Sequence, residues 1–157
     1  MQGQPNKFIP ALWGGVLIGI ISGVPFLGFI NCACCAGVIG GGLLAVYLYR
    51  KDLDPNQPMT MGEGAMLGLL AGLIGAVIGS VLSAVFSTAS FDFLYRLSEY
   101  VDEPELDEFL EEMDPSMLTG GLFFFGFLMS LIIDGLFGVI GGLLGVSFFG
   151  GAKNRAD

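Results

Sequence analysis

Residues 61–82 read MGEGAMLGLLAGLIGAVIGSVL, and this stretch decides the fold. Its glycines recur at intervals of three or four residues, at Gly64, Gly68, Gly72, Gly75 and Gly79. Residues with this spacing lie on the same side of an α-helix. A stripe of small residues on an apolar helix lets another helix approach closely, which matters most in lipid, where no hydrophobic force drives helices together. The stretch therefore predicts a membrane helix that packs through its glycines.

The same spacing recurs in the other apolar runs. In the last run Gly138 is four residues from Gly142, and Gly141 is four from Gly145. We expect a glycine zipper, in which the helix-packing positions are Gly15, Gly19, Gly23, Gly64, Gly68, Gly72, Gly75, Gly79, Gly138 and Gly142. The packing joins helices of one chain or of several chains. The alternative is that glycines line a permeation path, because small side chains leave space between helices.

Charge is scarce and segregated along the chain. Of the 157 residues 54% are hydrophobic and 13% are charged, against roughly 25% charged in a typical soluble domain. Residues 8–49 and 64–91 carry no charge, and residues 115–152 carry only Asp134. Uncharged runs of about 18 residues or more are transmembrane candidates. The first run continues directly into further apolar sequence, so it reads as a retained span and not as a cleaved signal peptide.

The apolar runs divide into four spans. As one helix, residues 8–49 would be roughly 63 Å long, about twice the hydrocarbon core of a bilayer. Pro25, Gly28 and Asn31 favour a turn in the middle. We therefore predict an all-α, polytopic membrane protein with a single domain, residues 1–157, and spans at about 8–24, 32–49, 62–86 and 122–149. Thr60 and Glu63 have the spacing of a capping box at the start of the third span.

An acidic segment separates the last two spans. Ten of the fifteen acidic residues lie between Asp92 and Asp114. After Pro104, apolar residues recur at helical spacing through Leu106, Leu110 and Met113, which predicts an amphipathic helical segment over about 91–116. The segment lacks the ligand spacing of an EF-hand loop, so a solvated acidic face is favoured over a cation site.

The basic residues set the orientation, because lysine and arginine mark the cytoplasmic side of a membrane protein. With four spans, both termini and the 50–61 loop lie on one side. Five of the six basic residues then fall there: Lys7, Arg50, Lys51, Lys153 and Arg155. We predict a multi-pass protein of the inner (plasma) membrane with both termini cytoplasmic and the acidic segment outside.

Several function classes are excluded. The chain has no histidine, which removes the commonest general base and metal ligand, and no nucleotide-binding or metalloprotease motif is present. Net charge is −9 without a basic patch, which argues against nucleic-acid binding. We predict a protein that is not an enzyme and needs no cofactor, with the lipid bilayer and either further copies or a larger membrane complex as partners.

Asp134 is the one acid inside an apolar run. An ionisable residue within a membrane span is a functional-site candidate by default. It would serve as a proton or cation site if it faced a cavity, and as an interfacial or hydrogen-bonded residue otherwise. A span at 122–141 would put it deep in the membrane, whereas a span at 130–149 would put it near the outer interface.

Cys32, Cys34 and Cys35 cluster at the start of the second span. Thiolates bind soft metals such as Cu(I) and zinc, so the cluster is a candidate metal or redox site. Cysteine also packs as a small buried hydrophobic residue, and this packing role is the favoured interpretation. A disulfide or lipidation is a further alternative.

The layout resembles small glycine-rich, four-span families of bacterial membrane proteins. The resemblance is carried by the helical hairpin, the short basic loop, the Met59-Thr60-Met61-Gly62-Glu63-Gly64 entry to the third span, the acidic segment and the final Phe/Gly/Ile-rich span. It implies a four-helix membrane bundle with no established activity. The cysteine cluster is also similar to the vicinal cysteines of small mercuric-ion transporters, whose second cysteine pair is missing here.

Two functions follow as hypotheses. The first is a non-enzymatic membrane protein that acts through glycine-mediated helix packing, as a homo-oligomer or an accessory subunit. The alternative is a small transporter or channel for protons, cations or soft metal ions that uses Asp134, the Cys32–Cys35 cluster or both. A third is the binding of an extracytoplasmic partner by the acidic segment.

Overall fold

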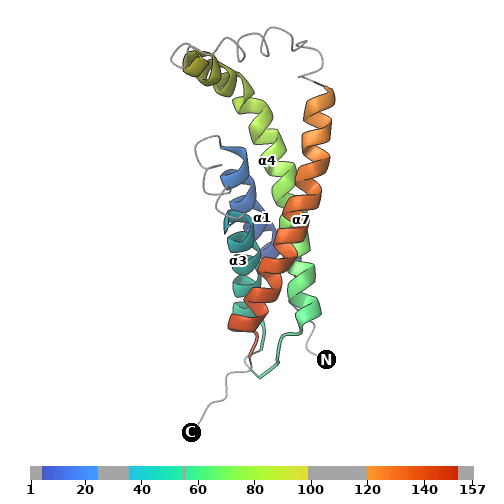
Figure 1. Ribbon diagram of the computed structural model, residues 1–157. Coiled ribbons are helices and arrows are strands. Elements are labelled where there is room, and N and C mark those ends of the chain that lie inside the picture. Colours follow the sequence, from blue (N-terminus) through green and yellow to red (C-terminus); the bar gives the residue numbers. More distant parts are fainter. Residues whose placement is uncertain (1–4, 25–35, 55, 99–119, 152–157) are drawn as a thin grey trace.

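The protein is a bundle of helices. A computed structural model describes residues 5–24, 36–54, 56–98 and 120–151, and in this part of the chain it has four helices and no strand. The helices are α1 (Phe8–Gly23), α3 (Ala36–Asp52), α4 (Met61–Ser98) and α7 (Gly121–Phe149) (Figure 1). The predicted all-α fold is confirmed.

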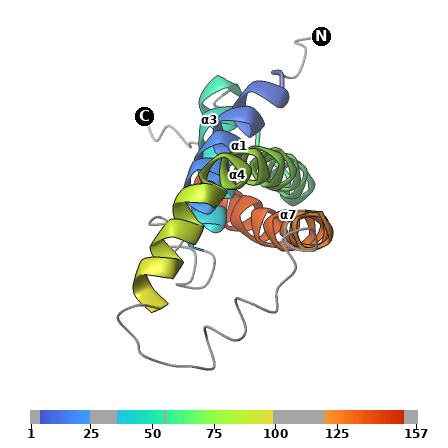
Figure 2. The same cartoon turned by 90° about the horizontal axis from the view of Figure 1, so that it is seen from above.

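α4 lies between α1 and α7 (Figure 2). α3 packs on both α1 and α7 and touches α4 over a smaller area. α1 and α4 run in the same direction, and α3 and α7 run the opposite way (Figure 1). The four helices therefore alternate in direction along the chain.

The helix bounds differ from the predicted spans at two places. α3 continues through Asp52, beyond the predicted end at residue 49, and residues 32–35 of the predicted span lie outside the described residues. α4 continues to Ser98, so the first part of the predicted amphipathic segment is the end of α4 and not a separate helix. The reason is that residues 80–103 contain no glycine or proline to stop the helix. Residues 99–116 of the predicted segment lie outside the described residues.

Two of the described helices are long and apolar enough to cross a membrane. The apolar stretches are Met61–Phe86 in α4 and Phe123–Phe149 in α7. α1 is also apolar but has only 16 residues. Beyond Phe86, the remaining turns of α4 lean away from α7 (Figures 1 and 2).

Local sequence signals explain where helices begin and end. Val24 is extended (φ −93°, ψ 121°) and ends α1, because a residue that precedes proline is pushed out of the helical region. The predicted capping box opens α4: the Glu63 backbone N–H donates to Thr60 Oγ1 at 3.3 Å, and the Thr60 N–H donates to Glu63 Oε2 at 2.9 Å.

Replacing Thr60 with alanine is expected to destabilise the bundle by about 1 kcal/mol, because the Thr60 hydroxyl no longer accepts from the Glu63 N–H or donates to the Glu63 carboxylate. Thermal unfolding of the purified protein in detergent, followed by circular dichroism, measures the effect. Thr60→Ser keeps the hydroxyl and should unfold close to the wild-type temperature. Equal stability of Thr60→Ala and wild type would contradict the role of the cap.

Polar contacts tie the helix ends together at the end of the bundle where the 53–60 loop lies. Lys7 Nζ lies 3.5 Å from Glu63 Oε1, which joins the start of α1 to the start of α4. The Met59 N–H donates to the Gly150 carbonyl at 3.1 Å, and Arg50 Nη2 donates to the Gly151 carbonyl at 3.3 Å. We call this end, which carries Lys7, Arg50 and Glu63, the basic end.

The glycines of α4 face two different helices. A Cβ on Gly64 would lie 2.6 Å from the Gly142 carbonyl oxygen, and one on Gly68 or Gly72 would likewise strike the backbone of α7. One on Gly75 would instead strike Ile18 of α1. Gly75 is eleven residues after Gly64 and therefore only about 20° from it around the helix axis. The partner changes because a different helix packs against α4 at that level.

The glycines of the other helices make equally close contacts. On Gly15, Gly19 or Gly23 of α1, a Cβ would lie about 2.6 Å from Ile74, Ile78 or Leu82 of α4. In α7, Gly138 and Gly142 face α4, whereas Gly141 and Gly145 face Ile39 and Val46 of α3. These are distances that real side chains do not adopt, so the helices approach this closely only because the positions are glycine.

The helices of the bundle bury many small residues and expose many large apolar side chains. The buried residues of α1 are Pro10, Ala11, Gly14, Gly15, Ile18, Gly19 and Gly23. Large apolar side chains point outward instead, among them Phe8 and Trp13 of α1, Val81 of α4 and Phe124 and Ile132 of α7. A soluble protein has the opposite arrangement, with large apolar side chains in its core.

Candidate functional site

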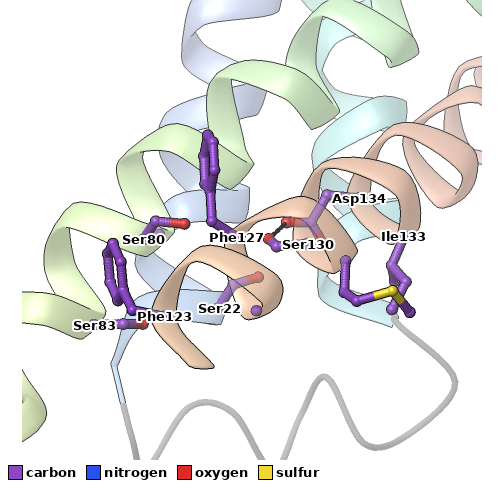
Figure 3. A pocket seen from close by; sticks show the side chains of 11 residues that line it. Ser22, Ser80, Ser83, Phe123, Phe127, Ser130, Ile133 and Asp134 are labelled. Atoms are coloured by element: carbon purple, nitrogen blue, oxygen red, sulfur yellow. Dashed lines mark hydrogen bonds between the residues drawn. The ribbon is translucent and has the colours of Figure 1, made fainter. Parts of the chain in front are cut away.

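A cleft opens between three helices near the end of the bundle opposite the basic end. Its volume is about 440 Å³. Its polar lining consists of Ser22 from α1, Ser80 and Ser83 from α4, and Ser130 and Asp134 from α7 (Figure 3). Its apolar lining is Phe123, Phe127, Met129 and Ile133, all from α7.

Asp134 is the buried acid of this cleft. Its exposed fraction is 3%, and it is the one charged or polar residue that is buried in the part of the chain that the structure describes. Ser130 Oγ donates to Asp134 Oδ2 at 2.8 Å. The two side chains meet because they are four residues apart on one helix. The carboxylate is thus oriented by its own helix.

The backbone of Asp134 is held against α4. A Cβ at Gly72 would overlap the Asp134 carbonyl oxygen and would lie 3.0 Å from Gly135 Cα. Since a side chain at Gly72 would push α7 outward, this glycine determines how near the carboxylate lies to the serines of α4. The packing contact and the polar cleft are therefore parts of one arrangement.

The serines bring hydroxyl groups from two other helices. Ser80 Oγ donates to the Ala76 carbonyl at 2.7 Å. Because a hydroxyl oxygen also accepts hydrogen bonds, Ser80 still offers an acceptor to the cleft. The side chains of Ser80, Ser83 and Ser22 are gathered around the same space as Asp134 in Figure 3.

Two aromatic rings stand beside the polar groups. Phe123, Phe127, Ser130 and Asp134 follow one another at i, i+4, i+7 and i+11, so they share one face of α7. Figure 3 shows Phe123 close to Ser83 and Phe127 close to Ser80. The cleft is therefore polar at Asp134 and aromatic toward the start of α7.

Two glycines contribute space to the cleft. Gly79 and Gly126 both line it. A Cβ at Gly126 would meet nothing within 4 Å, and one at Gly79 would make only ordinary contacts, the nearest at 3.5 Å to Ser22 Cβ. These two glycines differ from Gly68 and Gly72, which are in close contact with another helix.

The cysteine cluster stays a prediction. Cys32, Cys34 and Cys35 lie outside the described residues. Within the described ranges, no group of three or more cysteine and acidic side chains could hold a metal ion.

Sequence reasoning selected Asp134 but not the serines around it. The signal for Ser130 was present, since it lies one turn before Asp134. Ser22 and Ser80 had no such signal, because only the packing of α1 on α4 and of α4 on α7 brings them into the cleft of the carboxylate.

Comparisons with known proteins assign neither a family nor a function to the chain. No protein-family model, curated protein or solved structure matches the chain. The function must therefore be argued from the site.

Proposed function

We propose that this is a non-enzymatic integral membrane protein that binds a proton or a small cation at Asp134, within a cleft formed by a glycine-packed bundle of four spans. One observation carries the proposal: a buried carboxylate shares a cleft with hydroxyl groups from three different helices. A lone acid in an apolar bundle is costly unless it has a task or a partner. Its one side-chain hydrogen bond among the described contacts is to Ser130.

The outer surface of the bundle supports a lipid environment. The other helices bury only 28% of the apolar stretch of α4 and 17% of that of α7. A core helix of a soluble protein would be mostly buried. Exposing so much apolar surface to water would be unfavourable at about 25 cal/mol per Å², whereas lipid tails solvate it.

The shorter helices support four spans through their arrangement. With 16 and 17 residues, α1 and α3 are about 24–26 Å long, slightly less than the hydrocarbon core of about 30 Å. Local thinning of the bilayer accommodates such a mismatch at modest cost. α1 packs along α4 and α3 packs along α7, so each short helix shares the membrane environment of a longer one.

The topology prediction follows from the basic end, which we assign to the cytoplasm together with both termini. Green fluorescent protein fused after Asp157 is expected to fluoresce in bacterial cells, and alkaline phosphatase fused there to be inactive. Phosphatase inserted within residues 99–116 is expected to be active. The reverse pattern, or active phosphatase at both positions, would overturn the orientation or the number of spans.

The packing supports a deep position for Asp134. Its backbone lies against Gly72, which is eleven residues into α4 and therefore about 17 Å from the basic end. With the basic end at the interface, this is near the middle of a hydrocarbon core of about 30 Å. This depth favours a position of Asp134 deep in the membrane over a position near the outer interface.

Within the part of the chain that the structure describes, access to the cleft is one-sided. From Asp134 to the basic end the bundle is closed by the buried side chains of Val38, Val46, Tyr49, Leu67 and Val146 and by glycine contacts. Toward the other end Ser22, Ser83 and Phe123 line open space. This supports a binding site reached from the side of the acidic segment, as in a transporter with one face open, and not a continuous pore.

Ion flux into liposomes tests the proposal. Purified protein is expected to carry protons or monovalent cations into vesicles faster than protein-free vesicles do, measured with a pH dye and a potassium-sensitive dye. If folded protein produced neither flux, the transport role would be abandoned and the packing role would remain. The glycines would then serve only to hold the bundle, or a complex of which it is a subunit, together.

A further inference from the structure

We infer that the ligand of the Asp134 cleft is an organic monocation with an apolar body, such as a lipophilic amine or a quaternary onium ion. The inference rests on the proposed function, since it assumes that the cleft is the cation site. The carboxylate would hold the charged head, and the rings of Phe123 and Phe127 would hold the apolar part.

The charge of the cleft selects cations. Asp134 is the one charged side chain among the described residues of the lining, and no lysine or arginine joins it there. Ser130 donates to Asp134, and the hydroxyls of Ser80 and Ser83 add acceptors elsewhere along the same cleft. An anion of the same shape would meet a carboxylate without any compensating positive group.

The lining does not suit a divalent inorganic ion. Calcium takes six to eight oxygen ligands, and magnesium requires octahedral oxygen coordination. The cleft offers one carboxylate, and four of its eleven lining residues are the aromatic and aliphatic Phe123, Phe127, Met129 and Ile133. Aromatic faces attract organic cations through their quadrupole, so these residues are explained by an organic ligand.

The size of the cleft agrees with this class of ligand. Its volume of about 440 Å³ lies within the range of roughly 300–1,000 Å³ that is typical of small-molecule sites. Such sites combine mostly apolar walls with a few polar groups that fix orientation. A single ion would leave most of this space to water.

The rim connects the cleft with the outer surface of the bundle. Phe123 lines the cleft with an exposed fraction of 45%, and Met129 and Ile133 are similarly half-exposed. In a bilayer these side chains border the lipid. An amphipathic cation that is concentrated in the membrane would therefore reach Asp134 along a continuous apolar surface.

Binding of tetraphenylphosphonium to the full-length protein in detergent tests the inference. Tetraphenylborate is the matched control, because it has nearly the same shape and the opposite charge. Saturable binding of the phosphonium, no binding of the borate, and a loss of about tenfold or more in affinity in Asp134→Asn are expected. Equal binding of both ions, or unchanged affinity in Asp134→Asn, would overturn the inference.

A pair of adjacent phenylalanines supplies the second variant. Phe123 lines the cleft, whereas Phe124 does not and is 62% exposed on the outer surface. Phe123→Leu is expected to weaken phosphonium binding about three- to tenfold, and Phe124→Leu to leave it unchanged. Equal effects of the two substitutions would contradict a ring contact in the cleft.

The flux and binding assays together distinguish a failure of the ligand class from a failure of the proposed function. If Asp134-dependent proton or potassium flux occurred in liposomes without saturable phosphonium binding, the ligand class would be wrong and the cation site would stand. If neither flux nor binding occurred with folded protein, both would be wrong.

Discussion

Gly68→Leu is expected to separate α4 from α7 and to prevent the bundle from forming its native packing. A Cβ at this position would overlap the Gly138 carbonyl oxygen and lie 3.0 Å from the Gly142 backbone nitrogen. Backbone atoms cannot turn aside as a side chain does, so the helices must move apart. The cost should lie at or above the upper end of the ~1–3 kcal/mol typical of overpacking. Detergent-induced unfolding followed by circular dichroism measures it.

Gly40→Ala is the matched control for Gly68→Ala. Both residues lie inside helices, but a Cβ at Gly40 would meet nothing within 4 Å. Alanine favours a helix over glycine by up to about 1 kcal/mol, so Gly40→Ala should keep or slightly raise stability, whereas Gly68→Ala should lower it. If the two variants unfolded alike, the close approach of α4 and α7 would not be a source of stability.

Asp134→Asn is expected to abolish cation or proton flux while leaving the bundle folded. Asparagine has nearly the same shape, and its amide oxygen can still accept the hydrogen bond that Ser130 donates to Asp134 Oδ2 at 2.8 Å. It carries no charge and cannot release a proton. The expected result is a fall in flux to the level of protein-free liposomes, about tenfold or more, with an unchanged unfolding curve.

Ser147→Ala on the same helix is the control for that experiment. Ser147 is exposed, lies outside the cleft, and donates to the Leu143 carbonyl at 3.1 Å. Its substitution should leave flux intact. A purely structural role for Asp134 would show the opposite pattern, with lost stability and with flux that falls only in proportion to the folded fraction.

The sequence located most helices because long uncharged runs and turn-forming residues are visible along the chain. Long uncharged runs and turn-forming residues predicted helices close to those observed at α1 and α7, and the Thr60–Glu63 capping box is present at the start of α4. The predicted boundary between the third span and a separate segment from about residue 91 was wrong, because α4 continues to Ser98. The acidic residues after Asp92 suggested a new element there, but a change of charge does not stop a helix that contains no glycine or proline.

Candidate residues were predicted less completely than helices. Asp134 stood out because an acid in an apolar run is visible without a structure. Its surroundings were not visible, because Ser22 is 112 positions away along the chain and is brought to the cleft by the packing of α1 on α4. In the sequence, Phe123 and Phe127 are indistinguishable from exposed neighbours such as Phe124 and Phe125, and only the packing shows that they line the cleft.

By itself the sequence determined that the chain is helical, that its apolar runs suit a membrane and that its glycines suit close packing. These properties depend on composition and on spacing along one helix, so they can be read locally. Only the tertiary structure decided which glycines of α4 face α7 and which face α1, and that the helices leave a cleft at Asp134. The physical reason is that a glycine permits close approach from any side, and which side is used depends on the helix that packs there.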